Sequence, residues 1–389
     1  MIYGYHPTYY KHFLRIASKY PNDSRAKQIL NFNFHSRKEN PLWWISRFMH
    51  NQVPVDRTDT FNILKVDTWP IPDVDTSFKK TFDQICYATA TEYWNNNDDI
   101  SVLWSGGLDS TCVAIAFIET KPVGKKLTLV GTQESVDEYP SFYEQHKALM
   151  KIDTTEEFWG RFKYHQNETL YVSGDIGDQI FGGVIDEYAD HKDEPWESFI
   201  EWKDVFEQSA FNADNLARDW YKDEKGLFIK RFTKFNKKAP FPIITIFDFV
   251  WWLTYTTRYN GAANNITNLV NAVYKLEKAA IGTVDCFFHN YEFEQWSMLN
   301  HHLKFPGGPE TYKQPIKDFI ASYNGDMDFL INKRKEKSTP RLLGNDDWFR
   351  QWRLNDYSNY YLIMSDGTIY NTKNDIPFEL MVKSLTFIK

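Results

Sequence analysis

The sequence predicts an α/β fold built on a parallel sheet, and a few segments carry this prediction. An apolar run from Ile100 to Trp104 leads into a turn with two glycines, and another apolar run, Thr111 to Ile118, follows it. This order is typical of a strand, a tight turn and a helix. Short apolar segments at 127–130 and 169–172 predict two further strands, and a second glycine-rich turn follows the latter. Strands that alternate with helices form parallel sheets, whose ligands lie at the carboxyl ends of the strands.

The first turn, Ser105-Gly106-Gly107-Leu108-Asp109-Ser110, has the features of a phosphate-binding loop. Glycines let the backbone approach a ligand closely, and N–H groups at the start of a helix point at an anion. Ser105 and Ser110 add hydroxyl donors. Asp109 alone would repel an anion, so we expect a cation such as Mg²⁺ between its carboxylate and the phosphates. No Gly-Lys-Ser/Thr sequence ends the loop, which excludes the Walker type, and an ordinary capped strand-turn-helix corner is the structural alternative.

The second glycine-rich turn spans 173–183 and carries two carboxylates, Asp175 and Asp178, three residues apart. Because it also follows a strand, it should lie beside the first turn at the same edge of the sheet. Asp178 can complete the Mg²⁺ shell that Asp109 begins, and Asp175 can act as a base or contact the substrate. The alternative is a purely structural or calcium-like Asp/Gly turn.

Composition narrows the class of protein. A length of 389 residues predicts two or three domains, and 42% hydrophobic residues suffice for sizeable cores. A net charge of −7 does not favour nucleic acid as a partner. Three scattered cysteines argue against a disulfide framework or a zinc cluster and suit a reducing compartment. The most hydrophobic stretch, 241–253, is too short to cross a bilayer, and no signal segment is visible, so we expect a cytoplasmic protein without a membrane partner.

The first turn resembles the SGGxDS loop of the N-type ATP pyrophosphatases, the PP-loop superfamily, which includes asparagine, GMP and NAD synthetases. The second turn narrows the resemblance to the synthetase domain of asparagine synthetase and β-lactam synthetase. Ser173-Gly174, Gly177, Asp178 and Phe181-Gly182-Gly183 match that family's turn, whereas Gln179 and Val184 depart from it. The resemblance covers roughly 77–338. It implies a parallel-sheet core of the adenine nucleotide alpha-hydrolase-like (PP-loop) type with a helical C-terminal region, and cleavage of ATP to AMP and pyrophosphate.

The resemblance also implies roles for individual residues. Asp109 and Asp178 would hold Mg²⁺, and Asp175 would handle the nucleophile or substrate. Lys335 would stabilise charge in the transition state, with Lys333 and Lys337 as alternatives. Val130 and Gly131 end the second predicted strand, where backbone groups would contact adenine. The residues expected to bind ATP are Ser105, Gly106, Gly107, Leu108, Asp109, Ser110, Val130, Gly131 and Gly174.

On this basis we divide the chain into four regions. These are an N-terminal extension (1–76), a PP-loop ATP-binding core (77–189), a mainly helical synthetase region (190–340) and a tail (341–389) with a β-hairpin near Asp366-Gly367. Helical spacing predicts helices at 77–93, 138–150 and 316–323, the last preceded by Pro315.

The resemblance implies an ATP-dependent, AMP-forming amide ligase. It adenylates a small carboxylate, and ammonia or an amine then attacks. Ile2 and Tyr3 follow Met1 where asparagine synthetases carry a nucleophilic cysteine, so we expect no glutaminase activity. Nitrogen would come from free ammonia, a separate glutaminase chain or an amine on the substrate. Aspartate, which would mean asparagine biosynthesis, is one open substrate beside a cell-envelope precursor, a peptide or a modified nucleotide. The alternatives are a nucleobase- or tRNA-modifying member of the superfamily and a non-enzymatic nucleotide-binding relative.

Overall fold

The computed structural model describes a little over half of the chain. The described residues are 2–3, 17–27, 56–60, 69–152, 169–182, 201–203, 229–257, 259, 284–306, 311–332, 361–364, 369–371 and 379. The chain divides into two compact units. We call one the sheet unit (Pro72–Phe181 and Asn265–Arg334) and the other the terminal unit (Met1–Ile71, Gly182–Asn264 and Lys335–Lys389).

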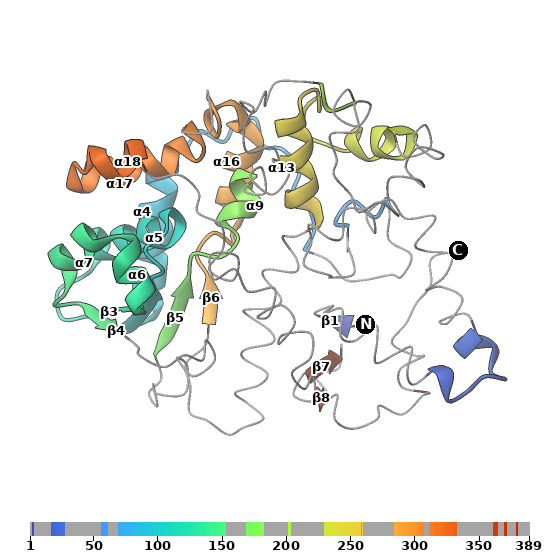
Figure 1. Ribbon diagram of the computed structural model, residues 1–389, viewed down its shortest axis with the longest axis horizontal. Coiled ribbons are helices and arrows are strands. Elements are labelled where there is room, and N and C mark those ends of the chain that lie inside the picture. Colours follow the sequence, from blue (N-terminus) through green and yellow to red (C-terminus); the bar gives the residue numbers. More distant parts are fainter. Residues whose placement is uncertain are drawn as a thin grey trace. The chain divides into compact units, whose positions relative to one another are not determined.

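A five-stranded parallel sheet forms the core of the sheet unit (Figure 1). Its strands are β2 (Asp99–Leu103), β3 (Lys126–Gly131), β4 (Met150–Ile152), β5 (Leu170–Ser173) and β6 (Val284–Cys286). They lie in the order β4-β3-β2-β5-β6, and every neighbouring pair is parallel. The α/β class and the parallel sheet are therefore confirmed.

This strand order contains a switch point between β2 and β5. From β2 the chain moves outward through β3 and β4, and it then returns to place β5 on the other side of β2. In open α/β sheets, ligands bind in the crevice outside the carboxyl ends of the strands at such a point. Both glycine-rich turns start there, because the first follows β2 and the second follows β5.

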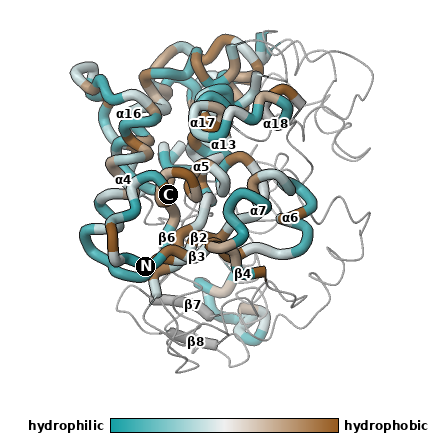
Figure 2. Tube along the Cα trace, turned by 90° about the vertical axis from the view of Figure 1, so that its left-hand side faces the viewer, coloured by the Kyte–Doolittle hydropathy of each residue, from teal (hydrophilic) through white to brown (hydrophobic). Residues whose placement is uncertain are grey.

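Helices cover this sheet because their apolar residues need burial. The helix α4 (Phe82–Asn96) begins with a capping box between Thr81 and Gln84. It packs against α5 (Leu108–Thr120), whose residues Ser110–Phe117 are all buried. The helix α17 (Gln314–Asn324) also packs on α5, and Pro315 lies in its first turn, as predicted. Hydrophobic residues gather at β2 and β3 in Figure 2.

Two secondary-structure predictions in this unit need correction. The single helix predicted at 138–150 is instead α6 (Gln133–Glu138), α7 (Pro140–His146) and then β4. Pro140 starts a new helix because it lacks an N–H group for the preceding turn. The strands β4 and β6 escaped prediction because segments of three residues, each with a charged residue in the middle, carry no periodic signal.

The remaining described helices of the sheet unit follow β5 in the sequence. They are α9 (Gly177–Phe181), α16 (Tyr291–Leu299), the 3₁₀ turn η3 (His301–Leu303) and α18 (Met327–Asn332). The helices α9 and α16 pack against each other, and the rings of Phe181 and Trp296 meet with centroids 5.3 Å apart. This contact holds the second glycine-rich turn against α16.

The terminal unit has an aromatic core of its own. Its long described helix, α13 (Ile246–Thr257), buries Trp251, Trp252 and Tyr255. The Arg57 guanidinium lies 4.7 Å from the Tyr255 ring centroid, within range of a cation–π interaction. A small antiparallel sheet joins β1 (Ile2–Tyr3), β7 (Tyr361–Met364) and β8 (Ile369–Asn371) in the order β1-β7-β8. The last two strands flank in sequence the predicted hairpin turn.

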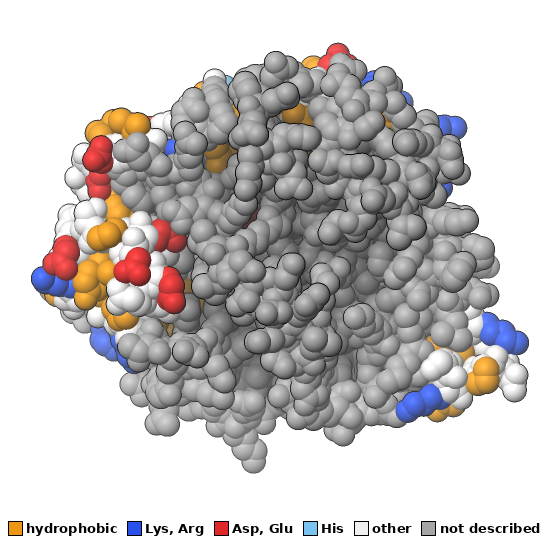
Figure 3. All heavy atoms as spheres, viewed as in Figure 1, with side chains coloured by type: hydrophobic (Ala, Val, Ile, Leu, Met, Phe, Trp, Pro, Cys, Tyr) orange, Lys and Arg blue, Asp and Glu red, His pale blue; other side chains and the backbone are white. Residues whose placement is uncertain are grey.

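Among the helices of the described residues, none combines the length and the apolar character that a bilayer crossing requires. Figure 3 shows acidic and basic side chains both present on the described surface. The three cysteines are buried and free, with the Cys86 and Cys112 sulfur atoms 3.8 Å apart.

Candidate active site

The two glycine-rich turns lie in direct contact. A Cβ atom added to Gly174 would lie 2.9 Å from the Ser110 amide nitrogen, and one added to Gly177 would lie 2.6 Å from the Asp109 Cγ. Real Cβ atoms essentially never come so close to other atoms. Glycine is therefore required at both positions for the second turn to fit against the start of α5. The predicted neighbourhood of the two turns is confirmed.

The first turn is held in shape by its own hydroxyl groups. The Ser105 N–H donates to the Ser110 Oγ at 3.0 Å, and the two hydroxyl oxygens are 2.9 Å apart. The Gly107 N–H donates to the Ser105 Oγ at 3.3 Å. Gly106 has a φ of 79° and lies so close to the Ser135 carbonyl that no Cβ would fit. The turn is thus a preformed glycine loop at the N-terminus of α5, the geometry that favours anions.

The second turn presents Asp175 to solvent beside the other carboxylates. The residue is exposed, although protein atoms surround its carboxyl group on several sides. This desolvation raises the pKa of Asp175, the charges of Asp109 and Asp178 raise it further, and a hydrogen bond from the Ser173 hydroxyl works in the opposite direction. A carboxyl group with a raised pKa is better suited to accept a proton near neutral pH.

Local backbone strain accompanies this turn. Ile176 is buried and adopts a φ of 76°, a left-handed conformation that is costly for a β-branched residue. Such strain persists only where the surrounding structure enforces it, and it clusters at functional sites. Here it orients the backbone between Asp175 and Asp178.

A buried lysine, Lys313, lies between the two predicted metal ligands. Its Nζ donates to the Asp109 carboxylate and, at 2.8 Å, to the Asp178 Oδ1. The Lys313 side chain is 4% exposed, whereas those of Asp109 and Asp178 are 23% and 38% exposed. Burial lowers the pKa of Lys313, but the two carboxylates outweigh it and raise the pKa overall. The lysine therefore stays charged and compensates the repulsion between the carboxylates.

The sequence reasoning missed Lys313. It lies just before α17 with a φ of 58°, and its N–H donates to the Lys304 carbonyl at 3.0 Å. The available sequence signal was Pro315, which marks the start of a helix and so places a basic residue at a helix N-terminus. The predicted lysine, Lys335, and its alternatives Lys333 and Lys337 lie outside the described residues.

The residues predicted to contact adenine end β3. The Val130 carbonyl accepts a hydrogen bond from the Trp104 N–H at 2.8 Å. Gly131 is buried against the Trp104 ring, where an added Cβ would lie 3.1 Å from the ring edge. Thus both residues belong to the carboxyl edge of the sheet, on the side of the first turn. Their contact with a base stays a prediction.

The donor set is suited to magnesium. Mg²⁺ usually binds proteins through one or two carboxylates and completes its octahedral shell with substrate phosphates and water. Asp109 and Asp178 provide two carboxylates that converge on one point, now taken by the Lys313 ammonium. Within the described part of the chain, His, Cys, Asp and Glu form no cluster of three or more with metal-binding geometry. Substrate phosphates and water would complete the shell of a Mg²⁺ ion held by these two carboxylates.

Comparisons with known proteins found neither a protein-family model nor a curated protein that matches this chain.

Proposed function

We propose that the chain is an ATP-dependent ligase that forms AMP and pyrophosphate while it joins a small carboxylate to ammonia or an amine. One observation carries this proposal. Asp109 and Asp178 follow two different strands, yet they converge on one cation, the Lys313 ammonium, at the switch point of the sheet. A triphosphate bound through Mg²⁺ needs a site of this kind, with a glycine loop beside it.

The chemical problem is the poor leaving group of a carboxylate. Attack of the substrate carboxylate on the α-phosphorus of ATP makes AMP the leaving group and releases pyrophosphate. The N–H groups at the start of α5 and the hydroxyl groups of Ser105 and Ser110 would stabilise the charge on the departing pyrophosphate. Bound Mg²⁺, held by Asp109 and Asp178, would neutralise phosphate charge.

Lys313 and Asp175 would serve the reacting groups. The charged ammonium of Lys313 would stabilise negative charge on the α-phosphoryl group, the role expected of Lys335 from the sequence. Asp175 would accept the extra proton of the attacking amine, which its raised pKa favours. The PP-loop type of fold, the cytoplasmic location and the absence of glutaminase activity belong to the same proposal.

The test is a product assay. Purified protein is incubated with ATP, Mg²⁺ and a panel of amino acids with ammonia, and nucleotides are separated by ion-exchange chromatography. We expect AMP and pyrophosphate, and we expect Asp109→Asn to slow their formation by about a hundredfold or more. The matched control is Asp98→Asn, because Asp98 precedes β2 at the opposite end of the strand and its side chain is 96% exposed. Formation of ADP and phosphate would overturn the proposal.

A non-enzymatic nucleotide-binding protein is the second candidate. It would bind ATP with Mg²⁺, measured by calorimetry, and would release no pyrophosphate with any member of the panel. The convergence of two carboxylates and a lysine exceeds what binding alone requires, and it favours the ligase.

A further inference from the structure

A second buried lysine, Lys304, is connected to the candidate site by hydrogen bonds. It is fully buried, and its Nζ donates to the Ser297 Oγ at 2.8 Å and lies 3.3 Å from the His301 Nδ1. Burial of a lysine is costly unless its donors are satisfied by defined partners. Hydrogen bonds connect Lys304 both to the helix that carries Asp178 and to the main chain of Lys313.

One set of contacts reaches the helix of Asp178. An ammonium group can only donate, so Ser297 accepts from Lys304 and turns its own proton to the Ile180 carbonyl, 2.7 Å away. Ile180 lies two residues after Asp178 in α9. Donor and acceptor are therefore fixed in both of these hydrogen bonds, and together they hold α9 against α16.

The other contact reaches Lys313 through the main chain. The Lys304 carbonyl accepts the Lys313 N–H at 3.0 Å, at the residue whose φ of 58° directs the chain into α17. Lysine at a positive φ is uncommon and needs such outside support. Lys304 thus holds the backbone of one member of the ion cluster and, through Ser297, the helix of another.

We propose that Lys304 is a positioning residue that keeps the Lys313 ammonium aligned with Asp178. It touches neither carboxylate of the cluster in the contacts above and acts through Ser297 and the main chain. Its catalytic meaning rests on the proposed function, because alignment of Lys313 matters for turnover only if Lys313 serves the reaction. The alignment itself is measurable without turnover.

The test is competitive labelling of lysines in the full chain with acetic anhydride, followed by peptide mass spectrometry. The variants are Lys304→Met, which removes the ammonium and keeps most of the side-chain length, and Ser297→Ala, which removes the hydroxyl that links Lys304 to the Ile180 carbonyl. We expect labelling of Lys313 to accelerate about fivefold or more in both, as for the loss of one buried hydrogen bond. Lys317 is the internal control, because it is buried on the same helix, α17.

The outcomes are distinct. Faster labelling of Lys313 alone supports the proposal, whereas equal acceleration at Lys317 reveals general loosening and overturns it, as does unchanged labelling of Lys313 in Ser297→Ala. A kinetic arm follows in a double-mutant cycle: Lys304→Met should slow pyrophosphate release in the wild-type background and add no slowing to Lys313→Ala. Failure of the wild type to form AMP would refute the ligase and leave the labelling result standing.

Discussion

The buried Lys313 and the partly exposed Asp178 form an ion pair across 135 residues of sequence, with 2.8 Å between the Nζ and Oδ1 atoms. The same ammonium contacts Asp109, which is 204 residues away. Two carboxylates at one place need a cation between them, and here the chain supplies it. The candidate site therefore holds a buried ammonium in contact with two carboxylates, which distinguishes it from a surface turn with acidic residues.

The first prediction concerns removal of this cation. Lys313→Met removes the ammonium that both carboxylates contact, and we expect the free energy of unfolding without Mg²⁺ to fall by about 1–3 kcal/mol. The value lies below that for a fully buried pair, because the Asp109 and Asp178 side chains are partly exposed. Urea unfolding measures it. Addition of Mg²⁺ should stabilise the variant more than the wild type, and equal stabilisation would contradict the arrangement.

The second prediction concerns the contact between the turns. Gly177→Ala introduces a Cβ that meets the Asp109 carboxylate, so we expect pyrophosphate release to fall at least about tenfold, since displacement of a catalytic group by an ångström is costly. Gly124→Ala is the control, because Gly124 has a φ of 88° with nothing within 4 Å of the added atom. That variant should lose stability through strain and keep its turnover. Equal kinetic losses in both would refute the specific contact.

The third prediction separates the two chemical steps. Asp175→Asn should leave adenylation intact, measured by exchange of labelled pyrophosphate into ATP, and should slow amide formation about a hundredfold. In the wild type, the rate of amide formation should rise with pH through an apparent pKa above the usual 3.9 of aspartate. Loss of pyrophosphate exchange in Asp175→Asn would mean that the residue serves the metal instead.

The same residue predicts a pH dependence of stability. Because the folded state raises the pKa of Asp175, the folded protein binds this proton more tightly than the unfolded chain. The contribution of Asp175 to the free energy of unfolding therefore falls as the pH rises from about 4 through the folded pKa. Asp175→Asn should remove this fall. Unfolding midpoints between pH 4 and pH 8, with Asp98→Asn as control, measure the difference.

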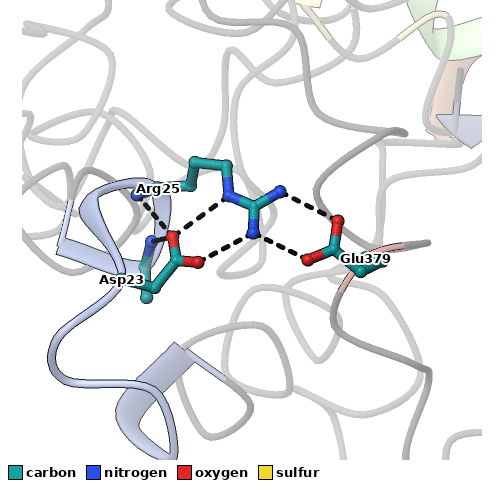
Figure 4. Close-up of polar contacts among 4 residues, drawn as sticks. Asp23, Arg25 and Glu379 are labelled. Carbon is teal, nitrogen blue, oxygen red and sulfur yellow. Dashed lines mark hydrogen bonds and ion pairs between the residues drawn. The ribbon is translucent and has the colours of Figure 1, made fainter.

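The last prediction concerns the terminal unit. Arg25 bridges Asp23 and Glu379 with hydrogen bonds of 2.7 Å from one nitrogen to each carboxylate, as Figure 4 shows. Chiefly through the side-chain hydrogen bond of Arg25, the pKa of Asp23 falls to about 2. Its contribution to stability is thus complete above about pH 4 and is lost as the pH falls toward 2.

The test of this bridge is acid unfolding. Arg25→Met should flatten the decline of stability between pH 4 and pH 2, and Glu144→Gln, which removes an exposed ion pair with Lys147, should not. The effect is modest because the groups are exposed to water. If the stability of Arg25→Met declined between pH 4 and pH 2 as steeply as that of the wild type, the bridge would contribute nothing in solution.

Much of the sheet unit follows from the sequence alone. The order of strand, glycine turn and helix around Ser105–Ser110 is a local pattern, and parallel strands carry their following turns to one edge. For this reason the sequence placed Asp109 and Asp178 in the same neighbourhood. The three-residue strands β4 and β6 escaped it, because so short a segment has no period.

Tertiary structure decided which cation meets the carboxylates. Basic residues are frequent along the chain. Pro315 marks a helix start beside Lys313, but nothing local in the sequence shows which groups Lys313 or Lys304 contacts. Their roles arise from hydrogen bonds between segments far apart in sequence, at a residue with positive φ that no glycine marks. The sequence determines local conformations through propensity and pattern, whereas the pairing of charges over long separations depends on how the packed helices bring them together.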